Sequence, residues 1–267
     1  MWVIQTGCPV VVLRPRPVRL VVSLAPGCES AAPAGAFRVC PRRRASPVGT
    51  IFMSLRVAIT GGIACGKSLF SRYLVQLGVE LLDADDVVHR LEAPGGEAVS
   101  ELARLFGNGV LDALGGIDRR ALGERVFADE AVRAQVNAVL HPLVRREIRA
   151  WVESPGCGLR AAVIPLLFEV GWADDWDVII CLASSEALQR ERLMRLRGLS
   201  EEQARRRIAA QMPVADKAAR SHLVVHNDAD VQALAREAEK VYRFLLERAY
   251  EYRARVSGAE SSTGPAR

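Results

Sequence analysis

The segment from residue 55 to residue 68 constrains the fold more than any other part of the chain. Residues 55–60 (LRVAIT) form a largely apolar run typical of a buried strand, and residues 61–68 (GGIACGKS) follow it directly. Helical periodicity begins at Lys67. A strand, a turn of the form G-x-x-x-x-G-K-[ST] and a helix, in this order, are the signature of a phosphate-binding P-loop. The segment therefore predicts a site for a nucleoside triphosphate.

Each part of this loop has a physical role in holding phosphate. Glycines let the backbone turn tightly and direct its N–H groups at phosphate oxygens, and the start of the helix adds its positive dipole. We expect Lys67 to contact the β- and γ-phosphates and to act in catalysis, and the Ser68 hydroxyl to bind Mg²⁺. The nucleotide contacts are expected from Gly61, Gly62, Ile63, Ala64, Cys65, Gly66, Lys67, Ser68 and Leu69.

Strands alternate with helices along the rest of the chain, which predicts a parallel sheet built from crossover units. Buried strands are expected at 55–60, 80–83, 159–167, 178–183 and 223–226, and helices at 67–77, 131–151, 185–196, 201–212 and 231–253. Ser200 and Gln203 form the pattern of a capping box at the start of one helix. The long helical stretch between the second and third strands, residues 86–150, predicts an inserted subdomain. The fold class is therefore α/β.

The ends of the chain differ in composition from its centre. Residues 1–52 contain seven prolines and seven arginines against one acidic residue, a charge of +6. Such a segment predicts disorder, and it is interpreted as an upstream start artefact preceding Met53, a targeting peptide or a tail with its own partner. Residues 53–255 are expected to form the folded domain, and 256–267 a polar tail. A chain that begins at Met53 is expected to fold and act like the whole.

Charge, hydropathy and cysteine content exclude several classes of function. Beyond residue 52 the chain has 29 basic and 30 acidic residues, so the high pI does not indicate a nucleic-acid surface. No apolar stretch approaches the ~20 residues of a membrane span. The six cysteines include no CxxC pair, which favours a reducing, cytoplasmic location over a disulfide or zinc scaffold. A monomer is expected, with oligomers left open.

A second cluster of functional interest is Asp83-Ala84-Asp85-Asp86, at the end of the second predicted strand. Ligands of parallel sheets bind at the carboxyl ends of the strands, so these carboxylates should face the same crevice as Lys67. A carboxylate there can accept the proton of an acceptor hydroxyl or hold Mg²⁺ through water. The structural alternative is that an aspartate before Val87 caps the following helix, with Asp85 or Asp86 near the cap. We expect both roles, with Asp85 reaching the site.

These motifs, taken with others in order along the chain, resemble the dephospho-CoA kinase family. The resemblance covers residues 53 to about 253. The loop from Thr60 to Ser68 resembles the family's TGGIGSGKS, and Asp83-Ala84-Asp85 resembles its DAD. Further matches are His141-Pro142 with its HP, Pro165-Leu166-Leu167-Phe168-Glu169 with its PLLFE, and Gln189, Arg192, Leu193, Arg207, Ile208, Gln211 and Lys217 with its lid pattern.

The resemblance implies a three-layer P-loop kinase-like fold with a central parallel sheet, a helical substrate-binding insertion and a helical lid at about 184–217. It implies transfer of a phosphoryl group from ATP, with Mg²⁺, to the ribose 3′-hydroxyl of dephospho-CoA, giving CoA and ADP. Asp85 is then the catalytic base. Asp83, His141 and Glu169 become candidate substrate contacts, although Glu169 could instead buttress the site.

The lid departs from the family pattern. The family usually has Arg-Asp where this chain has Leu196-Arg197. A lid arginine that neutralises the transferring phosphate is therefore expected from Arg192, Arg195 or Arg197, and we place Arg192 and Arg195 among the nucleotide contacts. Two other functions stay open at this point: a P-loop kinase of another small nucleotide or hydroxyl acceptor, and a nucleotide-binding switch protein.

Overall fold

The computed structural model describes residues 55–154 and 158–260, with side chains up to residue 252. The expectations for residues 1–52, for Met53 and for residues 261–267 lie outside the described residues. In chain order the elements are β1 (Arg56–Gly61), α1 (Lys67–Gln76), β2 (Glu80–Asp83), α2 (Ala84–Glu92), α3 (Glu97–Phe106), η1 (Asn108–Val110), α4 (Arg119–Ala128), α5 (Glu130–Glu153), β3 (Arg160–Val163), η2 (Ala173–Asp175), β4 (Val178–Ala183), α6 (Glu186–Arg197), α7 (Glu201–Ala209), α8 (Val214–Ala219), β5 (Leu223–His226) and α9 (Val231–Glu260).

The five strands form one parallel sheet in the order β2-β3-β1-β4-β5. The strand that leads into the predicted P-loop, β1, is therefore central. One strand, β3, separates it from β2, so the ends of β1 and β2 lie about 10 Å apart at the usual strand spacing. This places the P-loop and the aspartates after β2 at one edge of the sheet.

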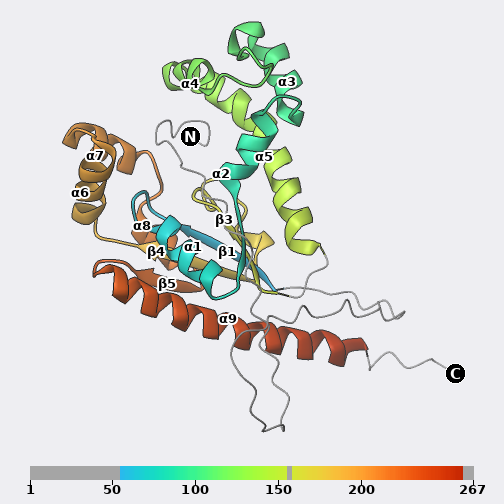
Figure 1. The fold of residues 1–267 in the computed structure, drawn as a ribbon, viewed down its shortest axis with the longest axis vertical. Helices are drawn as coiled ribbons and strands as arrows, with labels where there is room; N and C mark the ends of the chain where they lie inside the picture. The colour runs from blue at the N-terminus through green and yellow to red at the C-terminus, as the bar shows by residue number, and fades with distance from the viewer. Residues whose placement is uncertain (1–54, 155–157, 261–267) are drawn as a thin grey trace, which may run out of the picture.

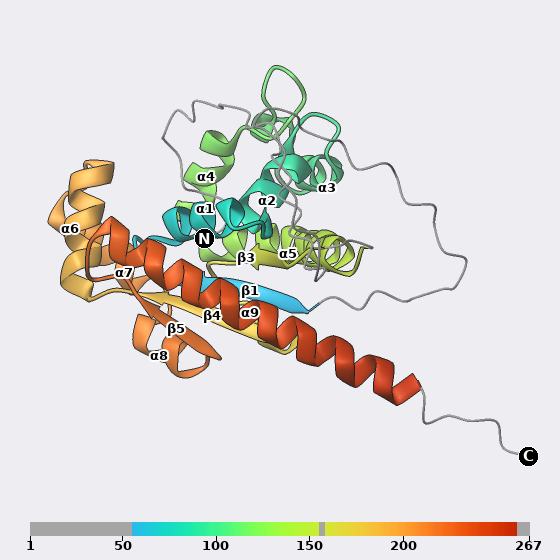
Figure 2. The ribbon, with the colours of Figure 1, turned by 60° about the horizontal axis from the view of Figure 1, so that its bottom comes forward.

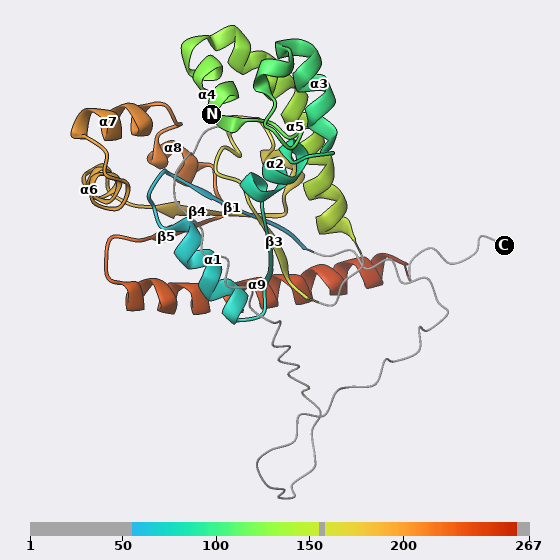
Figure 3. The same cartoon turned by 45° about the horizontal axis from the view of Figure 1, so that its top comes forward.

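Helices cover both faces of the sheet, which confirms the predicted three-layer α/β fold (Figures 2 and 3). Alternate residues of β1 point to opposite faces, as a strand requires. Val57 and Ile59 pack in a core with residues of α1 and α9, whereas Ala58 packs in a core with residues of α2 and α5. Because all three are fully buried, β1 is a rigid base for the loop that follows it.

The helices α2 to α5 make up the expected insertion between β2 and β3. Figure 1 shows α3 and α4 at the top, α6 and α7 at the left and α9 along the bottom. The apolar positions of α5 recur at Val136, Leu140, Val144, Ile148 and Val152, and all five are buried. None of the helices within 55–154 and 158–260 combines the length and apolar character needed to cross a bilayer.

Three local features differ from the sequence-based expectations. The third strand ends at Val163 rather than at residue 167, since Pro165 has no N–H to donate to a neighbouring strand. The short helix α8 was not expected. Helix α9 extends to Glu260, beyond the expected end at residue 253 and into the expected tail. The capping box of Ser200 and Gln203 is confirmed.

Candidate functional site

The P-loop occupies the turn between β1 and α1, where the backbone geometry requires glycine at two positions. Gly61 has a φ of +140°, and a Cβ there would lie 2.2 Å from the Leu182 carbonyl oxygen. Gly66, the N-cap of α1, has a φ of +88°, and its Cβ would lie 2.2 Å from Nδ2 of Asn227. The first N–H groups of α1 have no intrahelical partner, so they can bind phosphate oxygens.

Lys67, the first residue of α1, lies over this loop. Its ammonium donates hydrogen bonds to the carbonyl oxygens of Gly61 at 3.0 Å and Gly62 at 2.8 Å. Burial lowers the pKa of Lys67, and the carboxylates of Asp85 and Asp83 oppose that shift. The lysine is therefore a partly desolvated cation close to both aspartates, where its charge acts more strongly than in water.

Side chains of α6, of the segment after α7 and of the segment after β5 hold the loop in shape. Gln211 accepts a hydrogen bond from the Ile63 N–H at 3.0 Å, and Asn227 donates from Nδ2 to the Cys65 carbonyl at 3.0 Å. Arg192 donates to the Ala64 carbonyl at 3.3 Å. The Cys65 side chain is fully buried, as expected for a residue that points away from phosphate, and burial raises the pKa of its thiol.

Asp83 and Asp85 join the end of β2 to the start of α2. Asp83 is the N-cap, and its Oδ1 accepts a 2.9 Å hydrogen bond from the Asp85 N–H. The capping aspartate is therefore Asp83, and Asp85 and Asp86, which were expected near the cap, lie in the first turn of α2. Burial raises the pKa of Asp85, and the charges of Lys67 and Arg197 lower it. Burial and the Asp85 charge raise the pKa of Asp83 to about 7.

The P-loop and both aspartates line one cavity of about 1320 Å³. This exceeds the roughly 300–1,000 Å³ of a typical small-molecule pocket, so it can hold two ligands side by side. From the loop side it is lined by Ile63, Ala64, Gly66, Lys67, Ser68 and Leu69, from the lid side by Arg192, Arg195, Leu196, Arg197, Arg206, Arg207 and Gln211, and from the insertion by Val88, His89, Glu92, Arg119, Val126, Phe127 and Arg133.

The lid arginines divide into two kinds. The guanidinium of Arg192 donates to the Ser184 hydroxyl at 3.1 Å and the Asn227 carbonyl at 2.9 Å, besides its bond to the loop, so it braces the P-loop. Arg195 and Arg197 lie near the exposed end of α6 and line the cavity. Arg197 also lowers the pKa of Asp85, so the charge of this lid arginine reaches Asp85.

Glu169 does not line the cavity. Its carboxylate lies 2.7 Å from Nζ of Lys217, a fully buried lysine, and accepts a 3.1 Å hydrogen bond from the Met212 N–H. Lys217 also donates to the Pro165 carbonyl at 2.8 Å. Of the two roles expected for Glu169, this geometry supports the buttress, since the carboxylate is occupied by the lysine that links α8 to the segment after β3.

His141 also lies away from the cavity. It sits in the middle of α5 with its ring edge-on to Trp172, the ring centroids 5.9 Å apart. Its Nε2 is buried and has no hydrogen-bond partner in the described chain, and burial lowers its pKa. The structure therefore does not bring this predicted substrate contact together with the P-loop, because α5 turns His141 toward the core.

Ser68 fits the expected role of a magnesium ligand. Its side chain is exposed at the start of α1 and lines the cavity that Asp83 and Asp85 also line. The described residues contain no cluster of three or more acidic, histidine or cysteine side chains that could enclose a metal. A single hydroxyl with nearby carboxylates suits Mg²⁺, which keeps several waters and takes further oxygens from phosphates.

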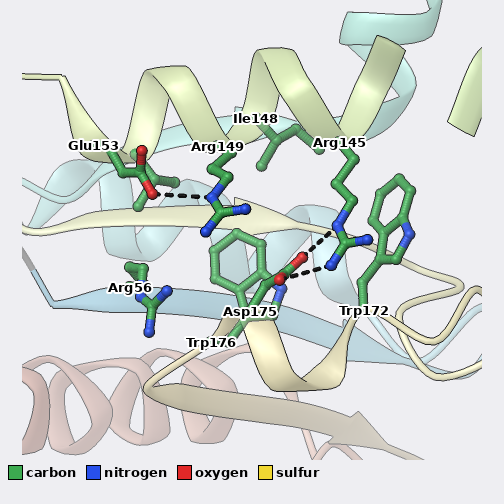
Figure 4. A pocket seen from close by; sticks show the side chains of 9 residues that line it. Arg56, Arg145, Ile148, Arg149, Glu153, Trp172, Asp175 and Trp176 are labelled. Carbon is green, nitrogen blue, oxygen red and sulfur yellow. Dashed lines mark hydrogen bonds and ion pairs between the residues drawn. The ribbon is translucent and has the colours of Figure 1, made fainter. Parts of the chain in front are cut away.

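A second pocket, of about 20 Å³, lies against α5 and has room for about one water molecule (Figure 4). Arg56, at the start of β1, lines it, so it lies at the opposite end of that strand from the P-loop. The arginines there are already paired: Arg145 with Asp175 at 2.7 Å and Arg149 with Glu153 at 3.1 Å. We assign it no ligand.

A sequence model of the dephospho-CoA kinase family matches residues 55–233, two-thirds of the chain. The chain belongs to the dephospho-CoA kinase family. The dephospho-CoA kinase of Anaeromyxobacter dehalogenans is 43% identical over 188 residues, which cover 69% of this chain and 89% of that protein. The dephospho-CoA kinase of Bdellovibrio bacteriovorus is 38% identical over 194 residues, covering 72% and 96%.

Solved structures agree with this membership. The Thermus thermophilus protein TT1252 aligns with a TM-score of 0.63 at 33% identity, over 72% of this chain and 98% of that one. Dephospho-CoA kinase from Campylobacter jejuni aligns with a TM-score of 0.51 at 25% identity, over 71% and 96%. Since the family model spans the sheet, the insertion and the lid, and these structures share the fold, the predicted P-loop kinase fold is confirmed.

Among the cavity residues that were not singled out from the sequence are Glu92 and Arg119. Glu92 is 2% exposed and its carboxylate pairs with Arg119 Nε at 2.9 Å. Its position carried a signal: Glu92 follows Val88 by four residues, so it lies on the buried face of α2, where a lone carboxylate is unusual. Arg119 carried none, because an arginine at the start of a helix is usually exposed.

Proposed function

We propose that this chain transfers the γ-phosphoryl group of ATP to the 3′-hydroxyl of the ribose of dephospho-CoA, giving CoA and ADP. The observation that carries the proposal is the shared cavity, in which Lys67 of the P-loop and Asp85 of the DAD segment face one space large enough for donor and acceptor. The names of the relatives support the same acceptor.

The reaction follows from the positions of the chain's own groups. The loop N–H groups and Lys67 hold the β- and γ-phosphates, and Asp85 accepts the proton of the 3′-hydroxyl as its oxygen bonds to the γ-phosphorus. The bond from the γ-phosphorus to the β,γ-bridging oxygen breaks in line with this attack, and ADP leaves with that oxygen. Burial raises the pKa of Asp85, which brings it nearer the operating pH as a base requires.

The remaining cavity residues position and neutralise charge. Arg195 and Arg197 lie where lid cations can neutralise the charge that spreads over the transferring phosphoryl group, and Arg192 keeps the P-loop in shape. Asp83 holds the start of α2 and thereby the position of Asp85. We place Mg²⁺ beside Ser68, where it neutralises phosphate charge when bound.

Measuring ADP release by the purified full chain with Mg-ATP and a panel of acceptors tests the function. The panel holds dephospho-CoA, shikimate, adenosine and a nucleoside monophosphate. ADP release that depends on dephospho-CoA, with a stoichiometric yield of CoA, is the expected result. Release with another acceptor supports a different small-molecule kinase, and release with no acceptor supports a hydrolase or nucleotide switch.

A further inference from the structure

The side chain of Glu92 is an unusual component of the cavity wall. It lies in the last turn of α2, its side chain is 1% exposed, and Arg119 Nε is its hydrogen-bond partner at 2.9 Å. The other oxygen, Oε1, is buried without a partner in the described chain. A buried ion pair with one unsatisfied oxygen contributes little net stability, and an apolar residue of similar size would serve a core better. Glu92 is therefore better explained by what it does to Arg119.

Arg119 is held firmly at its Nε end. It is the first residue of α4, whose N-cap, Asp118, accepts from the N–H groups of Arg120 and Ala121. Ile117, the residue before Asp118, donates its N–H to the Glu92 carbonyl at 2.8 Å, so the backbone of α2 also fixes this turn. In the part of the chain that the structure describes, the terminal nitrogens Nη1 and Nη2 of Arg119 have no hydrogen-bond or ion-pair partner.

The surroundings of Arg119 define the chemistry that it can recognise. Arg119 is 36% exposed and lines the cavity on the insertion side, together with Arg133, Val126 and Phe127. A fixed guanidinium with two free terminal nitrogens matches a phosphate group, which can accept both of them. The P-loop and the lid supply the cations for the nucleotide donor, so this arginine is available to the acceptor.

We propose that Arg119, held in place by Glu92, binds the diphosphate of dephospho-CoA, and that Glu92 is a positioning residue for acceptor affinity. The inference rests on the proposed function, since it takes dephospho-CoA as the acceptor. The diphosphate is the anionic part of that molecule, and the ribose that reacts lies on one side of it. Fixing the diphosphate on the insertion therefore helps to bring the 3′-hydroxyl to Asp85.

A double-mutant cycle on the full chain tests the inference. The variants are Arg119→Gln, Glu92→Gln and the two combined, assayed for kcat and for the KM of each substrate. We expect each single variant to raise the KM for dephospho-CoA about tenfold, the scale of one charge-assisted hydrogen bond. The KM for ATP and kcat should stay within about twofold. The double variant should match Arg119→Gln alone, because Glu92 acts through Arg119.

Two further variants separate positioning from general damage. Glu147→Gln makes the same chemical change in the exposed pair of Glu147 and Arg90, which joins α5 to α2 outside the cavity. This control should leave both KM values unchanged. If Glu92→Gln does not fold, Arg119→Lys replaces it. Lysine keeps the charge but loses the anchored Nε, so the KM for dephospho-CoA should rise by several-fold.

The possible failures are distinct. A wild-type chain without dephospho-CoA-dependent ADP release overturns the proposed function itself. With an active wild type, three results would each overturn the inference. They are a double variant in which the two single effects on the KM for dephospho-CoA multiply, single variants with an unchanged KM for dephospho-CoA, and single variants whose KM for ATP rises equally. As a further check on charge, added salt should raise the KM for dephospho-CoA less steeply in Arg119→Gln than in the wild type.

Discussion

The N–H of Asp85 donates a 2.9 Å hydrogen bond to the carboxylate of Asp83, so two acidic side chains are held side by side where α2 begins. Both are largely buried, and burial raises the pKa of each. Both residues line the cavity, and the Asp83 carboxylate also completes the helix cap. The charge of Asp85 contributes to the raised pKa of Asp83, so a change at Asp85 alters the proton affinity of Asp83.

Replacing the proposed base should lower turnover without loss of binding. In Asp85→Asn the side chain keeps its size but cannot accept a proton, so we expect kcat to fall by about 10²–10⁴-fold. The KM for ATP and the KM for dephospho-CoA should change by less than about threefold. Steady-state kinetics with a coupled ADP assay measures all three. Turnover close to that of the wild type would remove Asp85 as the base.

Replacing the capping aspartate should leave the acid limb of the pH profile nearly in place. Asp85 must be ionised to act as the base, so kcat falls as the pH drops through its pKa, which forms the acid limb of the profile. Because burial raises the pKa of Asp85, this acid limb lies above the usual range for a carboxylate. The pKa of Asp83 is raised to about 7, so below that pH Asp83 is itself largely protonated. Asp83→Asn therefore removes little charge beside Asp85 and should move the acid limb by less than about half a unit. Asparagine is an equally good N-cap, so α2 should persist. A profile of kcat from pH 5 to pH 9 in both proteins tests this, and a shift of one unit or more would contradict the raised pKa of Asp83.

Asp83→Asn should stabilise the folded chain, and more at high pH than at low pH. The pKa of Asp83 is raised to about 7, so between about pH 4 and pH 7 the folded chain binds a proton that the unfolded chain does not. Stability therefore falls as the pH rises through that window. Asp83→Asn, which carries no charge, should raise the Tm by about 3 °C or more at pH 8 and by less at pH 5. Equal shifts at both pH values would contradict the raised pKa.

Much of this architecture is determined by short segments of the chain and could be predicted from the sequence. The P-loop, the parallel sheet and the Asp83–Asp85 segment depend on short-range patterns, and Lys67, Ser68 and Asp85 do line one cavity. The partners of Glu169 and Arg119 depend on segments 48 and 27 residues away, brought together by packing. A motif names such residues as candidates but does not show whether a carboxylate faces a ligand or a buried lysine.

The glycine at the start of α1 should be irreplaceable for a steric reason. In Gly66→Ala the new Cβ would lie 2.2 Å from Asn227 Nδ2 at a φ of +88°, so the bond from Asn227 to the Cys65 carbonyl must break. We expect a loss of about 2–4 kcal/mol in the free energy of unfolding and a rise of more than tenfold in the KM for ATP.

Gly78→Ala is the matched control for this loop substitution. Gly78 has a φ of +98°, and a Cβ there would meet nothing within 4 Å, so alanine brings backbone strain without a clash. It should cost about 1 kcal/mol and leave the KM for ATP unchanged. Urea unfolding and kinetics on both variants decide the matter, and similar losses in the two would mean that strain, and not the contact with Asn227, sets the requirement.

The buried pair of Glu169 and Lys217 should contribute to stability and not to substrate affinity. Glu169→Gln leaves the fully buried ammonium of Lys217 without its counter-charge, so unfolding free energy should fall by about 3–5 kcal/mol. Adding Lys217→Met should restore most of that loss, since an apolar side chain then fills the site. Glu153→Gln, in an exposed pair with Arg149, should change stability by less than about 0.5 kcal/mol. If Glu169→Gln instead raises the KM for dephospho-CoA at nearly unchanged stability, Glu169 contacts the acceptor and the buttress role is wrong.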